Sequence, residues 1–162
     1  MAAAARFDPC PNDAPVMNVK DIMNATVITV SAETPVVDAC RAMLDHAVSG
    51  LPVVNDDGKV VGMVTEGDIM RQFEMQGARH ARSSIEPERG AQHKGGQWSV
   101  AEIMATEVVS VEEGTPIGQL AALLEQRRIK RVPVLRSGRL CGIVSRSDLL
   151  RVLLDELGGP AS

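Results

Sequence analysis

Two short motifs of the same form combine a hydroxyl group with a carboxylate. Thr65 and Asp68 stand three residues apart before an apolar run, and Ser145 and Asp148 repeat this spacing. An ionised carboxylate accepts strong charge-assisted hydrogen bonds, and the N-terminus of a helix offers free N–H groups to a phosphate. The same spacing is typical of a capping box, in which the hydroxyl residue begins a helix and the acid stands at its third position. The motifs alone leave ligand binding and helix capping both open.

A basic pair in the second half of the chain has the charge that a phosphate requires. Lys130 and Arg131 stand directly before an apolar strand, and arginine is the better bidentate partner of a phosphate. The alternative is a solvated basic helix end, which the helix dipole favours. The first half has small residues at this point, which would let a ligand approach the backbone. These are Val48, Ser49 and Gly50.

The sequence has no arrangement typical of an enzyme. It contains no nucleophile–base pair, no metal-ligand cluster and no phosphate-binding loop of the form G-x-x-x-x-G-K. Three scattered cysteines without a C-x-x-C pair, Cys10, Cys40 and Cys141, indicate a reducing compartment. No apolar run has the length needed to cross a bilayer. We therefore expect a cytoplasmic protein that is not an enzyme and that requires no cofactor, metal or membrane.

The charge and the aromatic content argue against nucleic-acid binding. The net charge is -4, and aromatic residues are 2 % of the chain. Nucleic-acid binders usually carry a basic surface, and single-strand binders add aromatic stacking platforms. Neither feature is present in this sequence.

An internal duplication organises the chain and places the motifs described above. Leu51-Pro52-Val53-Val54 recurs as Val132-Pro133-Val134-Leu135, and Thr34-Pro35 recurs as Thr115-Pro116, each 81 residues further along. After the next turn the offset becomes 80, and Gly62-Met63-Val64-Thr65 recurs as Gly142-Ile143-Val144-Ser145. A fixed offset between two copies is typical of repeated structural units. The sequence therefore predicts two copies of one unit.

Each copy predicts the same order of elements. Asn18 and Ser99 are N-cap residues for a short opening helix, and Thr34 and Thr115 are N-caps for the main helix. The predicted strands are 27–30, 51–55 and 59–64 in the first copy and 108–111, 132–135 and 139–144 in the second. Closing helices are predicted over 67–74 and 147–154. The fold class is α+β, with two β-α-β-β-α units packed sheet to sheet.

The predicted organisation has five parts. A flexible N-terminal segment, 1–16, precedes the first unit, 17–75. A Gly-, Ser- and Pro-containing stretch, 76–97, is predicted to be a flexible linker. The second unit, 98–157, is followed by a tail, 158–162.

The motifs together resemble the CBS domain, named after cystathionine β-synthase, in a tandem pair called a Bateman module. The resemblance covers residues 18–75 and 98–155. It depends on D/E-I-M, T-P at a helix start, L/V-P-V and G-h-h-T/S-x-x-D (h apolar), each present twice and in this order. The pair looks like a stand-alone bacterial module with pseudo-two-fold symmetry.

This resemblance implies a ligand and the residues that bind it. The ligands of the family are AMP, ADP and ATP, with S-adenosylmethionine in some members. By resemblance, Asp68 and Asp148 accept the ribose hydroxyls, and Thr65 and Ser145 contact ribose or phosphate. Arg131 and Lys130 are expected at the phosphates. The small residues and an apolar base pocket complete the predicted site, which comprises Val48, Ser49, Gly50, Ile28, Leu51 and Met63.

The resemblance also implies partners. It predicts a regulatory module that forms a homodimer and signals to an unidentified downstream protein through the orientation of its repeats. One alternative is a protein-interaction platform with vestigial nucleotide sites. A distant third is a redox or metal sensor using Cys40 and Cys141. The nucleotide, and whether one site or two are occupied, are left open.

Overall fold

The structure, a computed structural model, describes residues 16–83 and 98–158. The predictions for the N-terminal segment, for most of the linker and for the end of the tail lie outside these residues. In chain order the elements are α1 (Val19–Ile22), α2 (Val36–Asp45), β1 (Gly50–Val54), β2 (Val60–Thr65), α3 (Glu66–Ser83), the 3-10 helix η2 (Val100–Glu102), β3 (Val111–Glu112), α4 (Ile117–Arg127), β4 (Arg131–Arg136), β5 (Arg139–Ser145) and α5 (Arg146–Gly158). This order confirms the α+β class and the two repeats.

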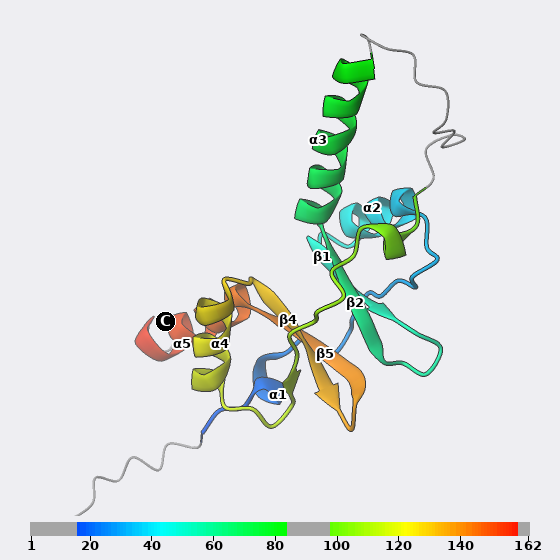
Figure 1. The fold of residues 1–162 in the computed structure, drawn as a ribbon. Coiled ribbons are helices and arrows are strands. Elements are labelled where there is room, and N and C mark those ends of the chain that lie inside the picture. Colours follow the sequence, from blue (N-terminus) through cyan, green and yellow to red (C-terminus); the bar gives the residue numbers. More distant parts are fainter. Residues whose placement is uncertain (1–15, 84–97, 159–162) are drawn as a thin grey trace, which may run out of the picture.

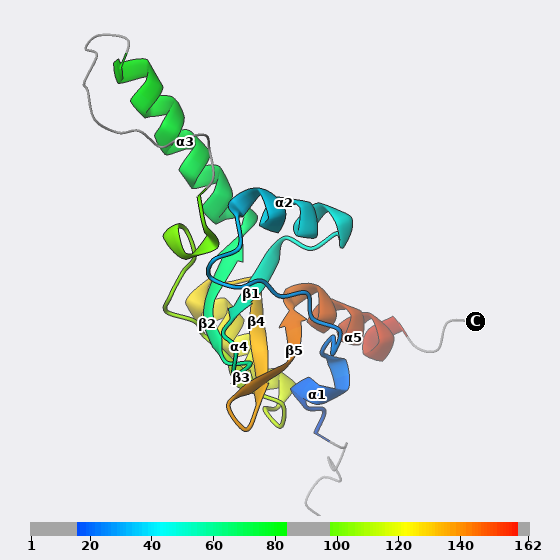
Figure 2. The same ribbon diagram turned by 90° about the vertical axis from the view of Figure 1, so that its right-hand side faces the viewer.

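The two hairpins form the centre of the molecule. Strand β1 pairs with β2, and β4 with β5, both antiparallel. Figures 1 and 2 show the hairpins next to each other, with α2 and α3 beside one and α4 and α5 beside the other. Glycines in the left-handed region, Gly58 (φ 75°) and Gly138 (φ 77°), make the turns. The predicted hairpins are therefore confirmed.

The opening helix of each repeat packs against the other repeat. Helix α1 contacts β5 and α5, and the backbone N–H of Val19 donates to the carbonyl of Thr115 at 2.8 Å. In the same way the N–H of Val100 in η2 donates to the carbonyl of Thr34 at 2.8 Å. The predicted capping boxes are present, since Asp21 accepts from the N–H of Asn18 at 2.8 Å. The helices are therefore in the predicted places, but they are exchanged between the repeats.

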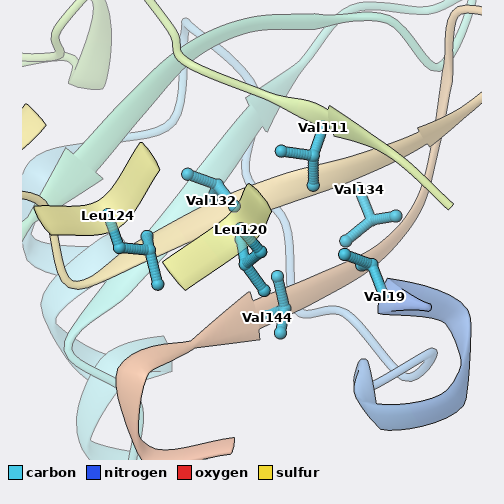
Figure 3. Packing of buried hydrophobic residues seen from close by; sticks show 7 residues of the cluster. All are labelled: Val19, Val111, Leu120, Leu124, Val132, Val134 and Val144. Atoms are coloured by element: carbon cyan, nitrogen blue, oxygen red, sulfur yellow. The ribbon is translucent and has the colours of Figure 1, made fainter. Parts of the chain in front are cut away.

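Each repeat consequently has a core that includes one exchanged residue. Val19 belongs to the core of the second repeat, with Leu120, Leu124 and Val144 (Figure 3). Val100 belongs to the core of the first repeat. Both valines are fully buried. Neither repeat completes its core from its own residues alone.

The first predicted strand of each copy is almost absent. Of residues 27–30 only Val30 pairs, accepting from the N–H of Val54 at 2.9 Å and donating to the carbonyl of Pro52 at 3.1 Å. In a parallel ladder the N–H of residue 52 would bind the carbonyl of Ile28, but proline has no N–H. In the second copy Pro133 occupies the equivalent place, and β3 has only two residues. The strand predictions were therefore too long.

Several helix boundaries also differ from the prediction. Helices α2 and α4 begin one residue later than expected, with Pro35 and Pro116 as the N-caps, and the Thr34 hydroxyl instead accepts from the N–H of Ser31 at 3.1 Å. Helix α3 continues to Ser83, so residues 76–83 of the predicted linker are helical.

No helix in the described ranges is long and apolar enough to span a membrane.

Candidate functional site

Two clefts lie between the repeats, and each takes residues from both. The first has a volume of about 500 Å³ and is lined by Thr65 and Asp68 of the first repeat and by segments 105–109 and 128–131 of the second. The second has a volume of about 480 Å³ and is lined by Ser145 and Asp148 of the second repeat and by segment 47–50 of the first. The two clefts therefore correspond to each other under the duplication.

In each cleft the hydroxyl and the carboxylate of the motif form a helix cap. One oxygen of Asp68 accepts from both the N–H and the hydroxyl of Thr65 at 2.8 Å, and Asp148 accepts from Ser145 with the same distances. Helix capping, one of the two alternatives that the motifs left open, is therefore present in both repeats. The cap holds each carboxylate rigidly at the start of α3 or α5, on the wall of its cleft.

The other oxygen of each carboxylate meets an arginine one helical turn further on. Arg71 donates to Oδ1 of Asp68, and Arg151 donates to Oδ1 of Asp148 at 2.8 Å. Both arginines line the same clefts as their aspartates. A carboxylate has about four acceptor positions, so these bonds leave capacity for a ligand hydroxyl. Each cleft thus has a carboxylate and a cation side by side.

Residues in the left-handed backbone conformation turn the chain from each main helix into the clefts. Ala47 (φ 52°) follows α2, and Arg128 (φ 53°) follows α4 at the equivalent position. Non-glycine residues adopt this conformation at a cost of about 1 kcal/mol. The turn places Ser49 and Lys130 where each lines both clefts.

Arg131 is the cation that lies between the clefts. It lines both of them, and its guanidinium donates to the hydroxyl of Ser49 in the other repeat. Burial lowers the pKa of this arginine, and the carboxylate of Glu66 acts in the opposite direction. The guanidinium remains charged, because arginine is not deprotonated in proteins. A half-buried cation therefore faces both cavities.

The clefts contain most, but not all, of the predicted site residues. The first cleft contains Ser49, Met63, Thr65, Asp68, Lys130 and Arg131. The second contains Val48, Ser49, Gly50, Lys130, Arg131, Ser145 and Asp148.

Leu51 and Ile28 are not among the residues that line the two clefts. Leu51 is fully buried in the core of the first repeat, and Ile28 packs against that core. Gly50 and the next three residues of β1 are all buried, so the usual alternation of inward and outward positions does not bring Leu51 to the cleft.

Several residues that line the clefts were not predicted from the sequence. Arg71 and Arg151 were detectable, because each stands three residues after a motif aspartate, on the same helix face. Asn24 in the second cleft and Ala105 in the first are equivalent under the 81-residue offset, but they reach the clefts only because the opening helices are exchanged. No local pattern signals that exchange.

Within the described ranges no group of three or more His, Cys, Asp or Glu side chains is placed to hold a metal ion. Cys40 and Cys141 are both free and half-buried. Burial raises the pKa of the Cys141 thiol, which makes it less reactive. These observations add no support for a redox or metal sensor.

Comparison with known proteins agrees with this architecture. The model of the CBS domain matches residues 19–74 and 100–155. The CBS domain-containing protein YhcV of Bacillus subtilis is 33 % identical over 132 residues, which cover 82 % of each chain. The solved CBS domain pair of protein MJ0100, in complex with 5′-methylthioadenosine and S-adenosyl-L-methionine, is 25 % identical with a TM-score of 0.71, covering 88 % of this chain and 99 % of that one.

A further solved structure, CBSX2 in complex with AMP, is 25 % identical with a TM-score of 0.69, covering 86 % of this chain and 98 % of that one. The family model alone matches well over half of the chain, at the two places where the duplication was found. The chain therefore belongs to the CBS-domain family and contains two CBS domains in tandem.

Proposed function

We propose that this chain is a regulatory module that binds an adenosine nucleotide of the AMP, ADP or ATP class in its clefts. One observation carries the proposal: each cleft joins a fixed carboxylate from one repeat to the shared Lys130–Arg131 segment. Each carboxylate keeps acceptor capacity for a ribose hydroxyl beside its cap and its arginine, and a guanidinium pairs with phosphate. The AMP bound by CBSX2 supports this class, and the 5′-methylthioadenosine and S-adenosyl-L-methionine bound by the MJ0100 pair support adenosine compounds more broadly.

The regulatory step in this proposal is a shift between two arrangements of the repeats. A ligand that contacts both repeats stabilises the arrangement it fits best, and can shift the equilibrium only by its differential affinity. A downstream protein would then recognise that arrangement. We assign the module no reaction of its own, and place it in the cytoplasm because of its scattered cysteines.

Self-association forms a second part of the proposal. Helix α5 exposes four leucines, and α3 exposes Met70 and Phe73. The exposed leucines of α5 are Leu150, Leu153, Leu154 and Leu157. A groove of about 430 Å³ between α4 and α5 continues this apolar surface. Contiguous apolar surfaces of this kind mark interaction sites, and they favour a homodimer. They also support the alternative function, an interaction platform without ligand.

Isothermal titration of AMP, ADP, ATP, S-adenosylmethionine and GMP into the full chain tests the ligand class. Asp68→Ala and Asp148→Ala should each remove binding in one cleft. The matched control is Asp21→Ala, because Asp21 forms the same kind of cap but lines neither cleft. Adenosine-specific binding that is lost in the cleft variants and kept in the control supports the proposal. No heat with any ligand would leave only the interaction platform.

A further inference from the structure

Gly50 and Arg131 mark a place between the clefts where the duplication is broken. Gly50 and Arg131 are equivalent, since Gly50 pairs with Thr65 in the first hairpin and Arg131 pairs with Ser145 in the second. The first repeat therefore contributes no side chain where the second contributes a cation. Arg131 is therefore the arginine that the two corresponding clefts share.

Contacts with the first repeat explain why one residue of the pair is glycine. A Cβ atom on Gly50 would lie 3.3 Å from Cδ of Arg131 and 3.2 Å from Cγ2 of Thr65. The arginine side chain thus passes directly over Gly50, and its terminal nitrogen reaches the hydroxyl of Ser49. The space that a second side chain would need is filled by Arg131.

The remaining arginines beside the aspartates cannot substitute for Arg131. Arg71 lines the first cleft and Arg151 the second, so each serves one cleft. Both are largely exposed, and both are paired with their own aspartate. Arg146 lines the second cleft, but its guanidinium donates to the carbonyls of Leu124 and Ile129 at 3.0 Å. Lys130 is shared but exposed, so its charge is weakened by solvent.

We propose that the two clefts compete for the guanidinium of Arg131, so that a phosphate-bearing ligand in one cleft weakens the binding of a second in the other. This inference rests on the proposed nucleotide function. One half-buried positive charge cannot neutralise two phosphates fully, and a phosphate that draws the guanidinium toward its own cleft removes it from the other. Coupling of this kind is reciprocal, since each site must affect the other by the same factor.

Titration of AMP into wild type and Arg131→Gln measures the coupling directly. In wild type we expect two affinities per chain that differ by about tenfold, a usual size for coupled sites. In Arg131→Gln the tighter affinity should fall toward the weaker one, because neither cleft then has this guanidinium. Arg131→Lys should keep a difference because it keeps the charge. Arg127→Gln is the matched control, because Arg127 is an exposed arginine that lines neither cleft.

The possible results separate the two proposals. A wild type that binds one AMP and an Arg131→Gln variant that binds two would contradict competition, because the loss of a shared cation cannot strengthen a site. Two equal affinities in wild type, an unchanged difference in Arg131→Gln, or one AMP in both proteins would overturn it while leaving nucleotide binding intact. No AMP binding by any variant would overturn the nucleotide function itself. Equal circular dichroism spectra and melting temperatures confirm that the variants are folded.

Discussion

Val19 donates its backbone N–H to the carbonyl of Thr115 at 2.8 Å, and so joins the start of the first repeat to the second. Its side chain is fully buried in the core of the second repeat. Val100 makes the reverse exchange. Because each core needs a residue from the other repeat, we expect the pair to fold as one unit.

Val19→Ala should destabilise the whole pair. Removing two buried methyl groups costs the chain about 2 kcal/mol of unfolding free energy. Urea denaturation measures this change, and a single transition is expected. Val16→Ala is the control, since Val16 is 69 % exposed and its loss should change stability by less than about 0.5 kcal/mol. If both variants matched wild type, the exchanged core would not contribute to stability.

Close packing of an exchanged segment on Gly62 leads to a second prediction. A Cβ atom on Gly62 would lie 2.5 Å from Sδ of Met104 and 3.0 Å from the carbonyl oxygen of Ala105. Gly62→Ala should therefore cost about 1 to 3 kcal/mol, as overpacking usually does. Gly118 lies in α4 with nothing near its Cβ position, so Gly118→Ala should stabilise by about 0.5 to 1 kcal/mol. Melting curves that show the same sign for both substitutions would contradict this account.

The thiol of Cys141 should ionise at a higher pH than an ordinary cysteine thiol. Burial raises its pKa, so less thiolate is present at any given pH, and alkylation by iodoacetamide should be slow. In a Cys10→Ser/Cys40→Ser background, the rate should reach half of its maximum above the ordinary value of about pH 8.5. The same protein in urea serves as reference and should show the ordinary midpoint. A pH midpoint of the alkylation rate below that of the unfolded chain would instead support the redox-sensor alternative.

Self-association can be tested on the exposed face of α5. Leu154 is 71 % exposed, so Leu154→Glu should leave the stability of the monomer unchanged while adding a charge to the proposed interface. Sedimentation should show a dimer for wild type and a monomer for the variant. Val16→Glu alters a residue of similar exposure, 69 %, outside this face and should remain dimeric. A monomeric wild type would remove the dimer from the proposal.

The local elements were predictable because each carries its own signal. The hairpins follow from the apolar runs around Gly58 and Gly138, and the caps follow from the spacing of Thr65 and Asp68. The exchange of Val19 was not predictable, since both copies have the same apolar pattern and a pattern does not state which copy it packs against. The missing first strand was detectable in principle, because Pro52 cannot donate to its ladder.

The candidate site was predictable to a similar degree. The resemblance assigned roles to the motif aspartates and to Arg131, and the duplication placed them in equivalent positions. That both clefts share Arg131 depends on how the two repeats pack, and a sequence pattern does not contain this information. Leu51 was assigned to the base pocket because the base pocket of the family is largely apolar, but burial on both faces of β1 removes it from the cleft.

A crystal structure of the full chain grown with AMP tests the central claim most directly. The account predicts that the ribose hydroxyls lie within hydrogen-bonding distance of the carboxylate of Asp68 or Asp148, and that the phosphate lies beside Arg131. AMP bound outside both clefts, or clefts without ligand at saturating AMP, would contradict it.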